Sequence, residues 1–301
     1  DLGVWVSACQ GQCPPKPLED CRVIVFAGDH GVSASGVSAY PTEVSIQMHA
    51  NINAGGAGVN AIAGVAGASV KSADISLDHE AEGPFRVRRS CGSIDVEDAM
   101  TQDECDRAIE VGKKLADDAI DEGADLLIAG DLGIGNTTPS AALLAASLDL
   151  RGADVAGRGT GIDDKKLAGK VAVIDQALDR IGDRARDPRQ RLAALGSADI
   201  AAAVGFISGA VRRGVPVVVD GLIASVEALL ADELYPGSRA WMVAGHRSTE
   251  PGCELAQTHL GLTPILDLQM RLGEGSGAVL SVGVLKAAVA ALREVTLLAD
   301  L

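Results

Sequence analysis

Short apolar runs alternate along the chain with longer segments in which apolar residues recur at helical spacing. The runs are rich in Val, Ile, Leu and Ala, which is typical of strands buried on both faces. They cover residues 22–26, 70–75, 126–129, 216–219 and 240–244. Helical spacing covers residues 41–50, 55–66, 101–122, 140–148, 163–181, 197–213 and 277–298. This alternation predicts an α/β fold with a parallel sheet, because right-handed crossovers through a helix return each strand in the same direction.

Polar residues gather directly after four of the predicted strands. These polar clusters cover residues 29–30, 131–138, 220–221 and 246–248. In a parallel sheet the loops that follow the strands share one edge, and ligands bind there. The shared placement therefore predicts one composite site. We interpret His30 and His246 as hydrogen-bonding residues that order these loops, rather than as metal ligands.

Residues 130–139, with the sequence Gly-Asp-Leu-Gly-Ile-Gly-Asn-Thr-Thr-Pro, carry the strongest chemical signal. Glycines between a strand and a helix let backbone N–H groups converge on an anion, and the helix N-terminus behind them favours negative charge. The segment lacks the Lys-Ser/Thr pair of a P-loop. A turn in which Thr137 or Thr138 merely caps the helix is the alternative. We predict that the phosphate of a mononucleotide binds to Gly133, Ile134, Gly135, Asn136, Thr137 and Thr138.

A second glycine-rich segment, residues 157–164, also precedes a predicted helix. It either wraps a ligand or forms a flexible connection in which Asp163 caps the helix, and the sequence leaves both open. Lys170 lies farther along the same helix. Its side chain either reaches a phosphate or is solvated.

Glu274 is the sharpest catalytic candidate, because it lies between glycines in the sequence Leu-Gly-Glu-Gly-Ser-Gly at residues 272–277. Flanking glycines let a substrate approach a carboxylate closely. Partial desolvation would raise the pKa of Glu274 and make it a useful general base. The alternative interpretation is that Glu274 caps the last helix.

Composition and charge argue against several classes of partner. The chain has 26 basic and 41 acidic residues, a net charge of −15, and only seven aromatic residues in 301. A nucleic-acid surface needs positive charge and stacking rings, so we expect no nucleic-acid partner. We expect no membrane span either, since no apolar run approaches about 20 residues. The six scattered cysteines favour free thiols in the cytoplasm over a zinc site, and we expect no metal and no cofactor.

Several segments together resemble the nicotinate-nucleotide:dimethylbenzimidazole phosphoribosyltransferase family, from about residue 21 to residue 291. The resemblance rests on residues 26–32, 36–41, 133–139, 157–164, 220–221, 246–252 and 271–278, which follow the family's order. It implies transfer of the phosphoribosyl group of nicotinate mononucleotide to dimethylbenzimidazole, which gives α-ribazole phosphate and nicotinate. It also implies a homodimer with a Rossmann-like three-layer αβα large domain and a small helical lobe. We place the large domain at residues 22–265 and the lobe at residues 1–21 and 266–301.

The resemblance also implies roles for individual residues. Glu274 corresponds to the general base, and the phosphate loop corresponds to residues 133–138, with Lys170 and the pair Asp220 and Gly221 nearby. Many members have Glu where this chain has Asp131, so a supporting carboxylate is one methylene shorter here. The residues implied for the acceptor-base pocket are Tyr40, Met48 and Leu272.

Two rival functions follow from the same residues. The acceptor could be another azole, a purine or a phenol, since a few pocket side chains decide that choice. The chain could also bind a nucleotide without catalysis. A dinucleotide-dependent oxidoreductase is disfavoured, because the glycine spacing of that fingerprint is absent.

Overall fold

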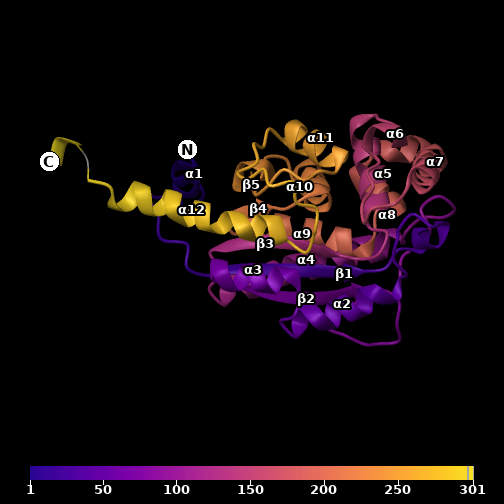
Figure 1. Ribbon diagram of the computed structural model, residues 1–301, viewed down its shortest axis with the longest axis horizontal. Coiled ribbons are helices and arrows are strands. Elements are labelled where there is room, and N and C mark those ends of the chain that lie inside the picture. The colour runs from indigo at the N-terminus through magenta and orange to yellow at the C-terminus, as the bar shows by residue number, and fades with distance from the viewer. Residues whose placement is uncertain (297, 301) are drawn as a thin grey trace.

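The computed structural model describes residues 1–296 and 298–300 and has the α/β architecture expected from the sequence (Figure 1). Within these residues the strands form one sheet in the order β2-β1-β3-β4-β5. Every neighbouring pair is parallel. The strands are β1 (Cys21–Gly28), β2 (Ala68–Ser76), β3 (Leu126–Leu132), β4 (Val217–Val219) and β5 (Met242–Ala244).

The strand order reverses between β1 and β3. The chain leaves β1 towards β2 on one side and then crosses to β3 on the other side of β1. At such a switch point the loops after the two strands diverge and leave a crevice at the carboxyl edge of the sheet. The register pairs Phe26 with Asp131, so both strands end at this crevice.

One face of the sheet carries most of the helices. Alternate strand residues such as Phe26 and Leu127 join the larger core cluster there. Phe26 packs edge-on against Phe206 with ring centroids 5.4 Å apart. The rest of this core is mainly Ala, Val, Leu and Ile, which suits closely packed helices. Its helices are α4 (Gln102–Asp121), α5 (Thr137–Leu148), α6 (Gly152–Val155), α7 (Asp164–Ile181), α8 (Pro188–Leu195), α9 (Ala198–Arg212), α10 (Leu222–Leu234) and α11 (Pro251–Leu260).

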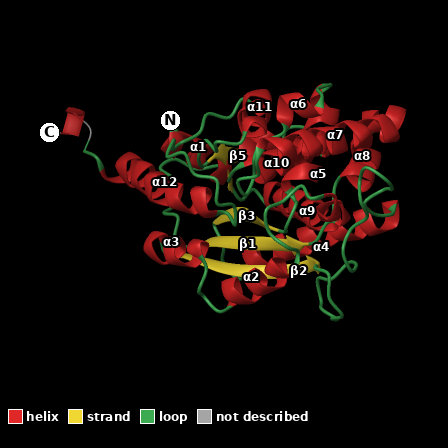
Figure 2. Cartoon of the chain, turned by 45° about the vertical axis from the view of Figure 1, so that its right-hand side comes forward, coloured by secondary structure: helices red, strands yellow, loops and turns green. Residues whose placement is uncertain are grey.

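The opposite face is covered by four helices, so the sheet lies between two helical layers, as Figure 2 shows. Val23 and Val25 of β1 point to this second core, whereas Ile24 and Phe26 point to the first. Burial on both faces explains why the strands read as continuous apolar runs. The covering helices are α1 (Leu2–Gln10), α2 (Glu43–Asn53), α3 (Gly58–Ala66) and α12 (Ser276–Glu294).

The two ends of the chain lie together. Helix α12 contacts both α1 and α3. The indole N–H of Trp5 donates to the carbonyl of Ala240 at 2.9 Å, and Arg293 donates to the carbonyl of Pro15 at 2.6 Å. Side chains of α1 and α12 share one core cluster with the sheet. The division into residues 22–265 and the two ends remains a prediction.

The predicted elements are found with shifted boundaries. Residues 240–241, predicted as strand, belong to a short 3₁₀ helix, η3 (Ser238–Trp241), and β5 begins at Met242. Three further 3₁₀ turns are η1 (Gly31–Ser35), η2 (Gly182–Arg186) and η4 (Leu298–Asp300). The helix predicted to reach residue 298 ends at Glu294. The sequence interpretation gave no bounds for α1, α6, α8, α10 and α11.

Helix α12 corrects one expectation. By length and composition it is apolar enough to cross a membrane, although no such segment was expected. Its Val279, Val282 and Leu285 are buried in the second core. We therefore regard α12 as a core helix whose outer side chains are also apolar. Figure 1 shows its C-terminal half extending beyond the sheet.

Candidate active site

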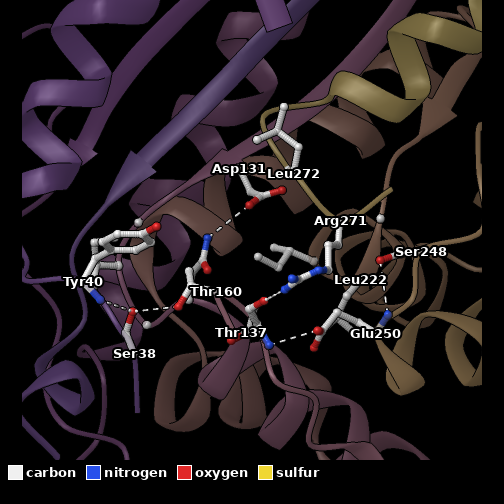
Figure 3. Close-up of a pocket in the computed structure, with 18 of the residues that line it drawn as sticks. Ser38, Tyr40, Asp131, Thr137, Thr160, Leu222, Ser248, Glu250, Arg271 and Leu272 are labelled. Carbon is white, nitrogen blue, oxygen red and sulfur yellow. Dashed lines mark hydrogen bonds between the residues drawn. The ribbon is translucent and has the colours of Figure 1, made fainter. Parts of the chain in front are cut away.

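A cavity of about 520 Å³ opens at the carboxyl edge of the sheet. It lies where the loops after β1, β3, β4 and β5 meet the segment that precedes α12, and Figure 3 shows its lining. Three of the four predicted post-strand clusters, residues 131–138, 220–221 and 246–248, contribute to its lining, whereas residues 29–30 do not. Nine predicted residues line it, namely Tyr40, Asp131, Gly133, Ile134, Gly135, Asn136, Thr137, Gly221 and Leu272.

The predicted phosphate loop forms the turn between β3 and α5. Gly133 passes so close to β1 that a Cβ at this position would lie 2.1 Å from the carbonyl oxygen of Gly28. The loop is held from the side by Ser45, whose Oγ accepts from the backbone N–H of Ile134 at 3.1 Å. Asn136 is the N-cap of α5, but no side chain caps this helix. The cap interpretation for Thr137 and Thr138 is therefore wrong. The N–H of Thr138 donates to the carbonyl of Gly135 at 3.0 Å and Pro139 has no N–H, so among the described residues at the start of α5 it is Thr137 whose N–H is available to an anion.

The side chain of Lys170 places a positive charge beside the phosphate loop. Its side chain is only 1% exposed, and its Nζ donates to Thr137 Oγ1 at 2.8 Å and to the carbonyl of Gly157 at 3.1 Å. Burial lowers the pKa of Lys170 to about 8, against the negative charge of Glu250, which raises it. The ammonium therefore lies beside the phosphate loop, and the solvated alternative for Lys170 is wrong.

Asp131 is one of two carboxylates that line the cavity, and the other is Glu250. The Oδ2 of Asp131 accepts from the side-chain amide of Asn136 at 3.1 Å. A Cβ at Gly273 would lie 3.1 Å from the same oxygen, so Asp131 also packs against the segment before α12. Burial, followed by the charge of Asp220, raises the pKa of Asp131 to about 7, and the charge of Glu274 adds to this. Asp131 thus titrates close to neutral pH.

Glu274 follows Gly273 and lies behind the residues that line the cavity. It has a left-handed backbone with φ of 62°, which is rare outside glycine, and it is 7% exposed. Its carbonyl packs against Gly130 at the end of β3, where a Cβ would lie 2.5 Å from the oxygen. Its Oε2 accepts from the backbone N–H of Val59, in the first turn of α3, at 3.4 Å. Burial raises the pKa of Glu274, the hydrogen bond from Val59 opposes this, and the charge of Asp220 adds to it.

Asp220, not Glu274, serves the N-terminus of α12. Asp220 is fully buried, and its Oδ1 accepts from the backbone N–H of Ala278 at 2.7 Å. The same oxygen lies 3.3 Å from His246 Nε2. Burial works against the charged imidazole, but the hydrogen bond and charge of Asp220 outweigh it, so the pKa of His246 is raised. The alternative interpretation of Glu274 as the cap of the last helix is therefore wrong.

The acceptor-base residues are separated in this structure. Tyr40 and Leu272 stand at the open mouth of the cavity, 56% and 57% exposed. Leu272 packs on the start of α3, since a Cβ at Gly58 would lie 2.9 Å from its Cδ2. Met48 is not among the lining residues and packs against the second core.

Several lining residues were not predicted as site residues. Ser38 and Thr160 bridge two loops at 3.5 Å, and Arg271 donates to the carbonyl of Gly159. Glu250 accepts from the N–H of Gly159 at 2.9 Å. All lie in segments that carry the family resemblance, which was the only available signal. Among the described residues no three His, Cys, Asp or Glu side chains are placed to share a metal ion.

Proteins of known family resemble this chain over most of its length. A family model, DBI_PRT, described as phosphoribosyltransferase, matches residues 1–300. A protein of Mycolicibacterium paratuberculosis named nicotinate-nucleotide–dimethylbenzimidazole phosphoribosyltransferase is 53% identical over 296 residues, which are 97% of this chain and 85% of that protein. A protein of the same name from Corynebacterium efficiens is 53% identical over 289 residues, covering 96% and 78%.

Two solved structures also resemble this chain over nearly its whole length. The crystal structure titled CobT from Thermus thermophilus superposes with a TM-score of 0.94 at 40% identity, covering 98% of this chain and 90% of that one. A second structure from the same organism, titled as the nucleotide–dimethylbenzimidazole phosphoribosyltransferase, has a TM-score of 0.92 at 39% identity and covers 98% and 89%. The likeness therefore extends over nearly the whole chain.

Proposed function

The chain belongs to the DBI_PRT family of phosphoribosyltransferases, and from this membership we propose that it transfers the phosphoribosyl group of nicotinate mononucleotide to dimethylbenzimidazole. The products are α-ribazole phosphate and nicotinate. One arrangement carries the proposal: Asp131, whose pKa is raised to about 7, and Thr137 at the start of α5 line one cavity, and the buried Lys170 ammonium donates to Thr137 Oγ1.

The nucleotide phosphate is assigned to the phosphate loop. The backbone N–H of Thr137 at the start of α5 supplies a donor, and Lys170 supplies a positive charge beside it. With the phosphate held at the loop, the ribose extends towards Asp131 and residues 271–273, which line the other side of the cavity. Fixing the sugar by its phosphate places the anomeric carbon for attack.

The reaction itself requires one base. The bond between the anomeric carbon and the pyridinium nitrogen breaks, and its electron pair returns to the ring, so nicotinate leaves without protonation. One nitrogen of dimethylbenzimidazole forms the new bond to the anomeric carbon, and its other nitrogen must lose a proton. Attack from the face opposite the leaving ring inverts the anomeric carbon.

We assign the proton acceptor to Glu274, with Asp131 in support. Burial raises the pKa of Glu274 and so makes it a stronger base than an exposed carboxylate. Asp131 packs against Gly273, next to Glu274, so the two carboxyl groups influence each other's charge. Two ionised carboxylates in one buried region repel each other, so the uptake of a proton by Glu274 removes its repulsion with Asp131.

A homodimer in the cytoplasm is part of the proposal. The outer side of α12 exposes Leu280, Val284 and Leu292, and α1 exposes Val4. Apolar side chains gathered on neighbouring helices favour an interface. A second subunit would also cover the exposed mouth of the cavity at Tyr40 and Leu272. The six cysteines are free thiols, which suits a reducing compartment.

The test is turnover with a panel of acceptors. The protein is incubated with nicotinate mononucleotide and dimethylbenzimidazole, adenine or a phenol, and nicotinate and the ribosylated product are quantified by chromatography. Equimolar nicotinate and α-ribazole phosphate support the proposal. Turnover only with a purine or phenol would replace the acceptor, and binding without release of nicotinate would favour the non-catalytic alternative.

A further inference from the structure

Glu250 lies at the phosphate end of the cavity and takes no part in the transfer chemistry assigned above. It directly precedes α11 and is 7% exposed. Its Oε1 accepts from the backbone N–H of Gly159 at 2.9 Å. Its Oε2 is buried and has no hydrogen-bond partner among the described residues. A buried carboxylate oxygen without a donor is costly, so a nearby positive charge must compensate it.

Gly157 separates Glu250 from that charge. The carbonyl of Gly157 accepts from Lys170 Nζ at 3.1 Å. A Cβ at Gly157 would lie 1.9 Å from Glu250 Oε2, so only glycine lets the carboxylate approach this closely. The carboxylate and the ammonium therefore lie on two sides of one glycine residue.

The same cluster reaches the phosphate loop. Lys170 Nζ donates to Thr137 Oγ1 at 2.8 Å. A Cβ at Gly159 would lie 3.3 Å from that hydroxyl oxygen, so the residue anchored by Glu250 packs on the loop. Figure 3 shows Glu250 and Thr137 on the same side of the cavity. The hydrogen bond that Glu250 accepts comes from the N–H of Gly159, which packs against Thr137.

Other charged groups near Lys170 have partners of their own. Arg158 pairs with Asp164 and Lys166 donates to the carbonyl of Ser38, whereas Arg271 donates to the carbonyl of Gly159, within the segment that Glu250 holds. The charge of Glu250 raises the pKa of Lys170, against burial. Loss of the Glu250 charge therefore leaves burial unopposed, and the lysine loses its proton at a lower pH.

We propose that Glu250 is a positioning residue for the nucleotide phosphate, which keeps the buried Lys170 ammonium charged and holds residues 157–159 against the phosphate loop. This proposal rests on the function proposed above only in taking the anion to be the phosphate of a nucleotide. Lysine binds an anion in its charged form, so affinity is lost as pH rises through the pKa of Lys170. The loss should come at lower pH once the Glu250 charge is removed.

The experiment measures anion affinity against pH in Glu250→Gln. Isothermal titration follows nicotinate mononucleotide and, as a probe that does not titrate, sulfate, from about pH 6 to about pH 9.5. The matched control is Glu254→Gln, one turn farther along α11, whose carboxylate is exposed and pairs with Arg247. We expect the pH at which affinity falls to move down by about one unit in Glu250→Gln, with about fivefold weaker binding near pH 8 and about tenfold weaker binding well above it. The control should match the wild type.

A merely structural role predicts a different result. Affinity would then fall by the same factor at every pH, and an unmoved pH profile overturns the proposal. Lys170→Met provides a second readout, because adding Glu250→Gln to it should cost no further affinity if Glu250 acts through Lys170. Full additivity of the two losses also overturns the proposal.

A second variant and a separate turnover assay distinguish a failure of the Glu250 proposal from a failure to fold or of the transferase assignment. If Glu250→Gln fails to fold, Gly157→Ala makes the same test, because the added Cβ displaces Glu250 Oε2. Anion affinity is measured without turnover, so a failure of the transferase assignment appears as absent nicotinate release with the pH profile intact. A failure of the Glu250 proposal appears as normal turnover with an unmoved profile.

Discussion

The side-chain amide of Asn136 donates a 3.1 Å hydrogen bond to Asp131 Oδ2. This bond joins the end of β3 to the residue that begins α5, so the Asp131 carboxylate and the N–H assigned to the phosphate are held as one unit. Gly273 packs against the same oxygen of Asp131, which brings the segment with Glu274 to this unit. Three sequence segments thereby meet around one cavity.

Asp131→Asn should change the pH dependence of the reaction. Burial and the charge of Asp220 raise the pKa of Asp131 to about 7, so its carboxylate is largely protonated below that pH. If the ionised form supports Glu274, kcat/KM of the wild type rises as pH increases through about 7. The variant should be slower by about tenfold or more at pH 8 and should lack this step. A step of unchanged size in Asp131→Asn would assign the titration to another group.

The same substitution should stabilise the fold at alkaline pH. The folded-state pKa of Asp131 lies above its unfolded value, so the stability linked to this group is fully present below about pH 4 and is lost as pH rises through about 7. Asparagine keeps the shape without the buried charge. We expect the free energy of unfolding at pH 8 to exceed that of the wild type by about 1 kcal/mol or more in urea titrations. Equal stabilities at pH 8 would argue against a charge penalty at Asp131.

Glu274→Gln should lower kcat by about 10² to 10⁴, the usual contribution of a general base. The amide cannot accept the proton of the attacking ring, but it keeps the size of the side chain and the contact with Val59. KM for nicotinate mononucleotide should change little, because the phosphate contacts lie elsewhere. Steady-state kinetics measure both constants. Retention of full turnover would remove Glu274 from the base role.

Gly133→Ala should destabilise the protein and weaken nucleotide binding. The added Cβ would lie 2.1 Å from the carbonyl oxygen of Gly28 and 2.8 Å from His30 Nε2, so β1 and the phosphate loop must separate. We expect a loss of about 2 kcal/mol or more in unfolding free energy. Gly64→Ala in α3 is the control, since nothing lies within 4 Å of its added Cβ. The control should gain about 0.5–1 kcal/mol, and equal effects of the two substitutions would contradict the close approach at Gly133.

Thr101→Ala tests the helix start that the sequence identified. Thr101 Oγ1 accepts from the N–H of Glu104 at 3.2 Å, and the Glu104 carboxylate accepts from the N–H of Thr101 at 2.9 Å. Removing the hydroxyl should cost about 1 kcal/mol of unfolding free energy. Activity of the folded variant should stay at the wild-type level, because α4 does not line the cavity. A loss of activity without a loss of stability would require a different role for this helix.

The strands and the phosphate loop could be predicted because their signals are local. Buried parallel strands read as apolar runs, and Gly133 to Thr138 combine glycines with a helix start. Helix α8 could not be recognised because its sequence, Pro-Arg-Gln-Arg-Leu-Ala-Ala-Leu, is polar at the start, and it is fixed by the capping side chain of Asp187 and by tertiary packing. Helix α10 was missed because it is buried along most of its length and lacks an amphipathic pattern.

Within the site, it was easier to predict which residues take part than to predict where their side chains point. Asp220 follows its strand as predicted, yet its carboxylate serves α12 and His246 instead of the cavity. Lys170 had two open interpretations, which only the fold of residues 157–164 against α5 could decide. Glu250 carried no local signal, since its importance arises from Gly157 and Lys170, which are distant in sequence. Contacts of this kind depend on the assembled fold.

The central claim is that one ribonucleotide is held by the phosphate loop while its anomeric carbon faces Asp131 and the segment that leads to Glu274. A crystal structure of the Glu274→Gln protein with nicotinate mononucleotide and dimethylbenzimidazole tests this most directly. We predict phosphate oxygens within hydrogen-bond distance of the backbone N–H groups of the phosphate loop, and the free nitrogen of dimethylbenzimidazole beside residue 274. A nucleotide bound with its phosphate away from this loop, or with its anomeric carbon remote from residue 274, would contradict the account.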